Sequence, residues 1–341
     1  MPVVCFGELL IRLTATGGHP LFILPTLEPF IGGAEANVAM ALQRLGHPAR
    51  MVSVVPDNAL GQGAVQELRR WGVDVNTVIT APGRMGLYFL TPGAIHRRAD
   101  IIYDRAASAF ALARFSRFNW PRLLKGASWL HVSGVTAALG KSCFAAALKA
   151  MDTARERGIK VSFDCNYRPK LWETWAGDAG DGAPGLIGQL MAQADLIFGG
   201  YRDIELISGQ TFEGDAGSVA RERAAADHAF ARFPHLERLV STCRTQVSAD
   251  HNRLSGQMFT RSQSMETRTY DLTGIIDRIG GGDAFASGVL HGILRGDDDG
   301  AALDYGIACG CLKHALPGDI SLATHEDLVD FLSEGSFDVR R

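Results

Sequence analysis

A run of three glycines followed by an aspartate is the most chemically informative feature of this chain. Gly280, Gly281 and Gly282 precede Asp283, and the apolar segment AFASGVLHGIL that follows has the character of a helix. Glycines at a helix start expose backbone N–H groups at the positive end of the helix dipole, and this arrangement binds anions such as phosphate. A carboxylate there repels phosphate, so Asp283 suggests a proton acceptor for a hydroxyl that attacks phosphorus. The alternative is an ordinary glycine-rich helix start that Asp283 merely caps.

A second glycine-rich helix start lies near the N-terminus. Residues 32–46 read GGAEANVAMALQRLG, in which apolar positions recur at helical spacing and a glycine ends the helix. The small residues Gly32 and Gly33 leave room for a ligand beside the first turn. Asn37, one turn further on, offers both a hydrogen-bond donor and an acceptor. The alternative for Asn37 is an exposed polar residue of the helix.

These two motifs, in this order, resemble the ribokinase/PfkB family of sugar kinases, and the resemblance covers essentially the whole chain. The family usually has D-x-x-G-A-G-D in its C-terminal motif, so Gly281 replaces the common alanine at a step that needs a small residue. The resemblance implies a single kinase domain over residues 1–341. Its expected fold is α/β and ribokinase-like, with a central, mostly parallel sheet flanked by helices and a small β-sheet lid over the sugar.

The same resemblance implies ATP and Mg²⁺ as cofactors and leaves open a monovalent cation. In this family the lid often forms a dimer contact, so we expect a homodimer or a higher homo-oligomer formed through the lid. An exposed edge strand also invites pairing with a second copy of the chain.

The composition fits a soluble globular protein. Of the 341 residues, 46% are hydrophobic and 21% are charged, and the formal net charge of −3 argues against a nucleic-acid-binding protein. No apolar run reaches the roughly 20 residues that span a bilayer. The N-terminus does not read as a secretory signal, and the six cysteines show no CxxC spacing. We therefore expect a protein of the reducing cytoplasm, without a membrane partner.

Apolar runs of strand character alternate with helical segments along most of the chain. The expected strands of this alternation lie at residues 51–55, 127–134, 159–166, 194–200 and 237–243. Such alternation indicates a parallel sheet with helices on both faces, whose ligands bind beyond the carboxyl ends of the strands. Short β-like pieces interrupt the rhythm at about 12–31 and 84–106, and these two segments are expected to form the lid.

Two arginines and a tyrosine near the expected lid and strand ends suggest an acidic substrate. Tyr103 and Arg105 alternate along a lid strand and so share one face, and Arg168 follows the strand at 159–166. Guanidinium groups bind carboxylates through paired, charge-assisted hydrogen bonds. A sugar acid therefore suits this set better than a neutral sugar. The alternatives are a solvated edge-strand charge for Arg105 and a contact to ATP phosphate for Arg168.

Within the family, three short patterns look like those of 2-keto-3-deoxygluconate kinases. They are Y-x-R on the lid, D-x-N-Y-R-x-x-L-W from Asp164 to Trp172, and P-G-D near the end. This resemblance implies ATP-dependent phosphorylation of the C6 hydroxyl of 2-keto-3-deoxygluconate, with Asp283 as the base. The substrate contacts that it carries over, with Tyr88 on the other lid strand as an extra candidate, are Gly33, Tyr103, Arg105, Arg168, Asp283 and Asp319.

Two other functions remain open at this point. One is a kinase of a neutral ketose or pentose, of the fructokinase or ribokinase type. The other is a sugar-acid-binding regulatory protein with weak catalysis. The sequence does not distinguish a gluconate-derived substrate from a galactonate-derived one.

The nucleotide side is less legible. After the strand at 237–243, the run TCRTQVSADHNRLSGQ stands where the family usually has a phosphate loop rich in lysine and glycine. The candidate contacts to ATP, from this run and from two other motifs, are Arg244, Ser248, Asn252, Gly256, Asn166 and Asp277. Asp277 could instead cap the helix.

The expected magnesium site departs from the family pattern. The family usually has N-x-x-E after a strand like that at 194–198, whereas this chain has Gly200 and Asp203 there. Asp203 can replace the acid and hold the metal weakly, through water. Gly200 cannot replace the asparagine amide.

Overall fold

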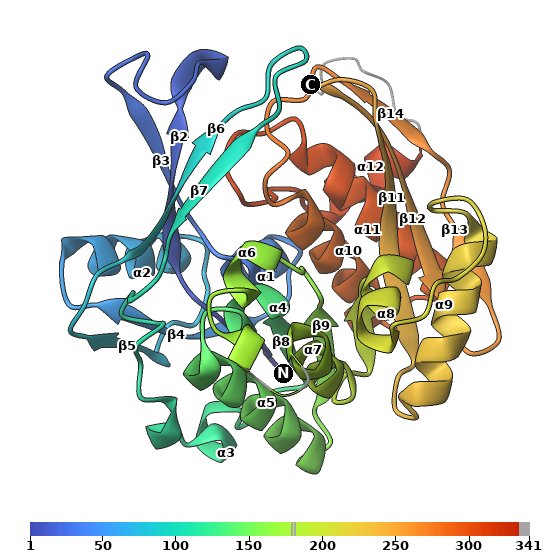
Figure 1. Ribbon diagram of the computed structural model, residues 1–341, viewed down its shortest axis with the longest axis horizontal. Coiled ribbons are helices and arrows are strands. Elements are labelled where there is room, and N and C mark those ends of the chain that lie inside the picture. Colours follow the sequence, from blue (N-terminus) through green and yellow to red (C-terminus); the bar gives the residue numbers. More distant parts are fainter. Residues whose placement is uncertain (179, 181, 334–341) are drawn as a thin grey trace.

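The structure, a computed structural model, describes residues 1–178, 180 and 182–333 and contains two sheets (Figure 1). The larger sheet has ten strands in the order β13-β12-β11-β10-β9-β8-β1-β4-β5, with β14 paired to β12. Neighbouring strands from β5 to β11 are parallel, and β12, β13 and β14 pair antiparallel. The strands are β1 (Val3–Phe6), β4 (Ala49–Pro56), β5 (Val78–Ala81), β8 (Trp129–Ser133), β9 (Lys160–Asp164), β10 (Leu196–Phe198), β11 (Arg238–Gln246), β12 (His251–Phe259), β13 (Ser264–Glu266) and β14 (Tyr270–Thr273).

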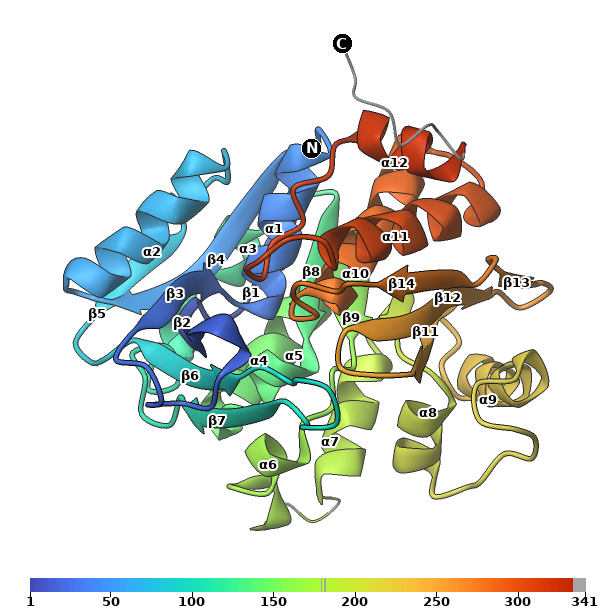
Figure 2. The same cartoon turned by 90° about the horizontal axis from the view of Figure 1, so that it is seen from above.

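Helices cover both faces of this sheet (Figure 2). One face carries α1 (Ala34–Arg44), α2 (Ala59–Arg70), α10 (Gly281–Arg295), α11 (Asp299–Lys313) and α12 (His325–Leu332). The other carries α5 (Lys141–Glu156), α7 (Gly182–Met191), α8 (Tyr201–Ser208) and α9 (Val219–Arg232). The central strands are buried on both sides, as expected of a parallel sheet between helical layers. The predicted central, mostly parallel sheet with flanking helices is confirmed. Among the described residues, no helix is both long and apolar enough to cross a bilayer.

A four-stranded sheet stands over the carboxyl ends of the main strands (Figure 1). Its order is β3 (Leu27–Gly32), β2 (Leu10–Ala15), β6 (Gly86–Thr91) and β7 (Asp100–Asp104). These strands fall within or close to the two segments expected to form the lid, and the predicted small sheet is confirmed. Its action as a lid stays a prediction. Self-association through this sheet also stays a prediction. Two apolar side chains in the loops between its strands, Phe22 and Ile95, are 80% and 79% exposed and would suit such a contact.

Three glycines mark the neck between the two sheets. If Gly7 carried a Cβ atom, that atom would lie 2.0 Å from Glu35 Oε2. A Cβ at Gly33 would lie 2.1 Å from the Glu8 carbonyl oxygen, and one at Gly86 would lie 2.6 Å from Glu8 Oε1. Side chains therefore do not fit where the chain crosses between the sheets. At Gly33 the added atom would meet the backbone of Glu8, and room for a ligand beside Gly33 stays a prediction.

A chain of three histidines joins α10 to α12 and to the turn after α1. His47 Nε2 lies 2.8 Å from His291 Nδ1, and His291 Nε2 lies 2.9 Å from His325 Nδ1. A neutral imidazole has one donor and one acceptor, so neutral rings can satisfy such a series. Burial lowers the pKa of His291 to about 3, and positive charge on His47 or His325 would lower it as well.

We expect these three histidines to make the folding stability depend on pH. The unfolded state binds a proton at His291 near pH 6.5, whereas the folded state does so only near 3. The contribution of neutral His291 to the free energy of unfolding is therefore fully present above about pH 6.5. It decreases as the pH falls toward 3, by up to roughly 1.4 kcal/mol per pH unit. Urea unfolding between pH 5 and 7.5 measures this dependence. His291→Gln, which does not titrate, should flatten it, and an unchanged slope in that variant would contradict the expectation.

Candidate active site

Asp283 lies in the first turn of α10, and the second motif reaches it. Asn37, the fourth residue of α1, donates from Nδ2 to Asp283 Oδ2 at 2.7 Å. The Asn37 side chain is buried, so the alternative of an exposed helix residue is excluded. The fold thus brings together two motifs that stand at opposite ends of the sequence.

The surroundings of Asp283 suit a base that works near neutral pH. The pKa of its carboxyl is raised to about 7, mainly by burial, and the neighbouring Asp164 and Asp319 act in the same direction. The hydrogen bond from Asn37 and the charge of Arg168 oppose this rise. A general base is most effective when its pKa lies near the working pH.

The three glycines before Asp283 form the turn into α10 and its first residues. Gly280 caps α10 with a left-handed φ of 78°, and a Cβ on it would lie 1.8 Å from the Asp319 carbonyl oxygen. At Gly281 a Cβ would lie 3.0 Å from His314 Cε1, whereas at Gly282 it would meet nothing within 4 Å. The first turn of the helix therefore has an open side, where its unpaired N–H groups can hold an anion.

A buried arginine, which the sequence analysis missed, joins the small sheet to this loop. Arg12 of β2 is fully buried and forms two ion pairs, from Nη2 to Asp277 Oδ2 at 2.6 Å and from Nε to Asp319 Oδ1 at 3.0 Å. The Gly318 N–H also donates to Asp277 Oδ2, at 3.1 Å. The Asp277 carboxylate, expected at ATP or as a helix cap, is thus engaged in bracing the loop. An arginine inside the apolar strand LIRLTA was the available signal.

Several expected substrate residues meet on the side that faces the small sheet. The Tyr88 hydroxyl donates to Asp319 Oδ2 at 3.0 Å. Tyr103 is the register partner of Tyr88, and the two ring centroids are 6.3 Å apart. Gly32 keeps the adjoining corner clear, because a Cβ there would lie 2.7 Å from Asp319 Oδ2. These four residues therefore line one region beside the glycine loop.

Arg105 directly follows β7 and is only 5% exposed, so it is not a solvated edge-strand charge. Its Nε donates to Glu8 Oε2 at 2.7 Å, and the Ser108 hydroxyl donates to the other oxygen of the same carboxylate. Across residues 1–178, 180 and 182–333, neither Nη group of Arg105 has a hydrogen-bond partner. Glu8, which the sequence analysis also missed, thus fixes the guanidinium plane and leaves two parallel donors for another acceptor.

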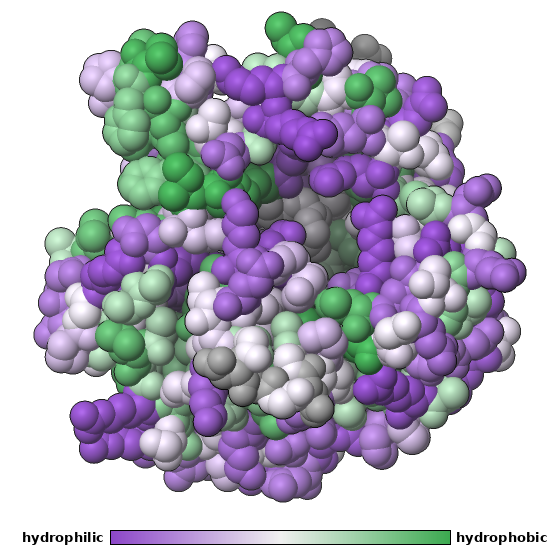
Figure 3. Space-filling model, in the orientation of Figure 1, coloured by the Kyte–Doolittle hydropathy of each residue, from purple (hydrophilic) through white to green (hydrophobic). Residues whose placement is uncertain are grey.

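Three further arginines, Arg168, Arg244 and Arg278, interact electrostatically at the site. The pKa of Arg244 is lowered by burial and by the positive charges of Arg278 and Arg168. In the described part of the chain, none of the three forms an ion pair. Hydrophilic residues border the hollow in the middle of this face of the molecule (Figure 3). Unpaired guanidinium groups that repel one another suit a polyphosphate, and Arg278 was not expected from the sequence.

Comparison with known proteins decides the family. The family model for pfkB family carbohydrate kinases matches residues 2–325. The chain belongs to this family. It is therefore a carbohydrate kinase, and the predicted enzyme class is confirmed. As family members, such kinases bind ATP with Mg²⁺.

Individual kinases show how close the relationship is. The kinase is 31% identical over 339 residues to the 2-dehydro-3-deoxygalactonokinase of Haloferax volcanii, with 99% of each chain covered. The crystal structure of 2-dehydro-3-deoxygluconokinase from Thermotoga maritima matches with a TM-score of 0.91 and 34% identity, over 98% and 99% of the two chains, which confirms the ribokinase-like fold. A fructokinase from Vibrio cholerae O395 with bound fructose, ADP and potassium shares the fold, with a TM-score of 0.77, 20% identity and coverage of 97% and 98%.

In this kinase the expected phosphate loop is a β-hairpin, because its residues pair as β11 and β12. Ser248 lies in the turn, where its hydroxyl donates to Asp250 Oδ1 at 2.7 Å. The Asn252 side chain is fully buried, and a Cβ on Gly256 would lie 3.1 Å from Phe285 Cε2. Asn252 and Gly256 are therefore both buried, and their contact with ATP stays a prediction.

Asn166 forms a tight turn at the end of β9. Its φ of 37° lies in the left-handed region, and its N–H donates to Asp164 Oδ1 at 3.1 Å. This turn directs the chain toward the exposed Arg168 two residues later. A direct contact between Asn166 and ATP stays a prediction.

A second carboxylate accompanies Asp203 at the start of α8. Asp203 Oδ2 accepts the Gly200 N–H at 2.9 Å, and Glu222 of α9 accepts the Tyr201 N–H at 2.8 Å. A Cβ at position 200 would lie 3.0 Å from Glu222 Oε1, so the glycine admits this side chain. Burial raises the pKa of Glu222 to about 7, and the charge of Asp203 acts in the same direction. Two carboxylates that disfavour each other's charge fit a nearby cation.

Direct metal ligation is a separate question. Among the residues that the structure describes, no group of three or more His, Cys, Asp or Glu side chains is placed to hold a metal ion. Asp203 and Glu222 supply oxygen donors of the kind that suit Mg²⁺, and binding of the ion through water stays a prediction.

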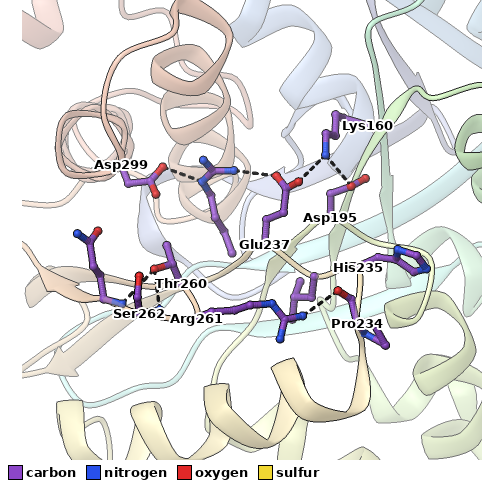
Figure 4. Close-up of a pocket in the computed structure, with 12 residues that line it drawn as sticks. Lys160, Asp195, Pro234, His235, Glu237, Thr260, Arg261, Ser262 and Asp299 are labelled. Carbon is purple, nitrogen blue, oxygen red and sulfur yellow. Dashed lines mark hydrogen bonds and ion pairs between the residues drawn. The ribbon is translucent and has the colours of Figure 1, made fainter.

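A charged pocket outside this site lies at the amino edge of the sheet (Figure 4). Its volume is about 670 Å³. Lys160 pairs there with Asp195 at 3.0 Å and with Glu237 at 2.5 Å, and Arg238 pairs with Asp299 at 2.7 Å. The charges neutralise one another and lie at the edge opposite Asp283, so this pocket is not the catalytic site.

Proposed function

We propose that this kinase transfers the γ-phosphoryl group of ATP to the C6 hydroxyl of 2-keto-3-deoxygluconate or of the galactonate-derived acid. The observation that carries the proposal is Arg105, a buried guanidinium held by Glu8, whose two Nη groups have no hydrogen-bond partner among the described residues. A substrate carboxylate supplies two oxygens for these two Nη groups, whereas a neutral ketose offers them no charged acceptor. The similarity to two keto-deoxy sugar acid kinases supports the same substrate class.

In this mechanism Asp283 accepts the proton of the attacking hydroxyl. The new O–P bond forms as the bond between the γ-phosphorus and the bridging oxygen breaks, and ADP leaves with that electron pair. The N–H groups at Gly280–Gly282 stabilise the charge on the transferred group. Arg168, Arg244 and Arg278 hold the remaining phosphates. Asp203 and Glu222 would hold Mg²⁺ through water, and the ion would supply positive charge that offsets the charge of the phosphates.

Kinetics on a substrate panel test the proposal. ADP formation is measured with both keto-deoxy acids and with fructose and ribose. We expect kcat/KM for the better acid to exceed that for either neutral sugar by roughly 10²–10⁴-fold, because the neutral sugars give the Arg105 Nη groups no carboxylate to bind. The ratio between the two acids assigns the preferred C4 configuration. Comparable or higher efficiency with a neutral sugar would instead identify a fructokinase or ribokinase type of enzyme.

A further inference from the structure

A lysine is completely buried behind the glycine loop. Lys313, the last residue of α11, has 0% of its side chain exposed. Its Nζ donates to the carbonyl oxygens of Leu316 at 3.0 Å and Asp277 at 3.3 Å. Lysine is almost never fully buried without paired charges, because an ammonium loses its hydration. Burial accordingly lowers the pKa of Lys313, while the carboxylates of Asp277 and Asp319 oppose that change.

The two carbonyl groups belong to the two backbone segments that shape the phosphate side of the site. Asp277 begins the segment that ends in the glycine cradle, and Leu316 precedes the turn that carries Asp319. These segments touch: the Ile276 N–H donates to the His314 carbonyl at 2.9 Å, and Gly280 packs against the Asp319 backbone. The Lys313 ammonium thus connects both segments from behind, on the side away from solvent.

An ammonium bound by backbone carbonyl oxygens has the same charge as a coordinated monovalent cation and the same kind of oxygen neighbours. Carbonyl oxygens that replace a hydration shell are how proteins bind K⁺. Here the cation is covalently part of the chain and cannot dissociate. Arg12 adds a second fixed charge on the other side of Asp277, at 2.6 Å from its carboxylate.

We propose that Lys313 is a positioning residue that supplies a built-in cation to the phosphate loop, so that this kinase needs no monovalent metal ion. The proposal rests on the kinase function but holds for whichever sugar is phosphorylated. It predicts equal activity in potassium, sodium and tetramethylammonium chloride at one ionic strength. Wild-type activity that requires potassium would overturn it.

Two substitutions separate the charge of Lys313 from its volume. Lys313→Ala opens a cavity and should lower kcat roughly 10–100-fold in tetramethylammonium, because charge-assisted hydrogen bonds to the loop are lost. Potassium or ammonium ions should restore much of this loss. Lys313→Met fills the space without charge, so its kcat should fall and not recover. The exposed Lys149→Ala, on α5, is the matched control and should behave as wild type in every salt.

Thermal unfolding supplies a readout that does not require turnover. Potassium should raise the Tm of Lys313→Ala above its value in tetramethylammonium, and should leave wild type and Lys313→Met unchanged. Absence of both rescue and a Tm shift in Lys313→Ala would refute the built-in cation. Failure of every sugar in the kinetic panel would refute the proposed substrate class instead, and the Tm comparison would still decide the role of Lys313.

Discussion

Asp283→Asn is expected to lower kcat by roughly 10²–10⁴-fold while leaving the binding of the sugar largely intact. The asparagine keeps the size of the side chain but cannot accept the hydroxyl proton. Because burial raises the pKa of Asp283 to about 7, wild-type activity should fall as the pH drops below about 7 and the base becomes protonated. Initial rates over a pH series measure both effects.

The control for this variant is Asp152→Asn on α5, a carboxylate far from the site, which should keep the wild-type rate. The residual activity of Asp283→Asn should also lack the decline below pH 7. A variant that retains a near-normal rate, or the same pH profile, would remove Asp283 from its assigned role.

Arg105→Ala is expected to raise KM for the keto-deoxy acid by roughly 10²-fold, with little change in KM for ATP. Two charge-assisted hydrogen bonds to the substrate carboxylate are lost. The acid should bind poorly, whereas a neutral sugar should be affected much less. Steady-state kinetics with each substrate varied in turn measure this difference.

Related variants separate the role of the Arg105 guanidinium from that of the Glu8 carboxylate that holds it. Arg105→Lys keeps the charge but not the parallel donors, so it should recover only part of the affinity. Glu8→Gln should also raise KM for the acid, because Arg105 then loses the carboxylate that fixes its plane. The matched control is Arg98→Ala, because Arg98 is an exposed arginine in the loop between β6 and β7. Equal effects of Arg105→Ala on acid and ATP would refute the carboxylate assignment.

Residues in local sequence patterns were the ones that could be predicted. The glycines before Asp283 and those before Asn37 stand at helix starts, where residue type and backbone conformation are coupled over a few positions. Their order along the chain identified the family and hence the fold. Alternation of strands and helices then placed both motifs at the carboxyl edge of the sheet.

Residues whose roles depend on distant partners could not be predicted. Arg12 and Glu8 follow or lie within apolar strands, and nothing nearby in sequence names Asp277 or Arg105 as their partners. The run around Arg244 lacks the usual loop composition, and strand pairing rather than local preference makes it a hairpin. Glu222 comes close only because position 200 has no side chain, a consequence of tertiary packing.

The chain is closely packed at Gly7, Gly33 and Gly86, where it passes between the two sheets. Strand β1 continues into β2 through three residues, and β3 reaches α1 through Gly33 alone. We therefore expect a rotation of the small sheet to move α1 with it. Since α1 carries Asn37, an outward movement of the small sheet would then separate the Asn37 amide from the Asp283 carboxylate. Opening of the sugar side of the site and loss of the hydrogen bond between Asn37 and Asp283 would then occur together.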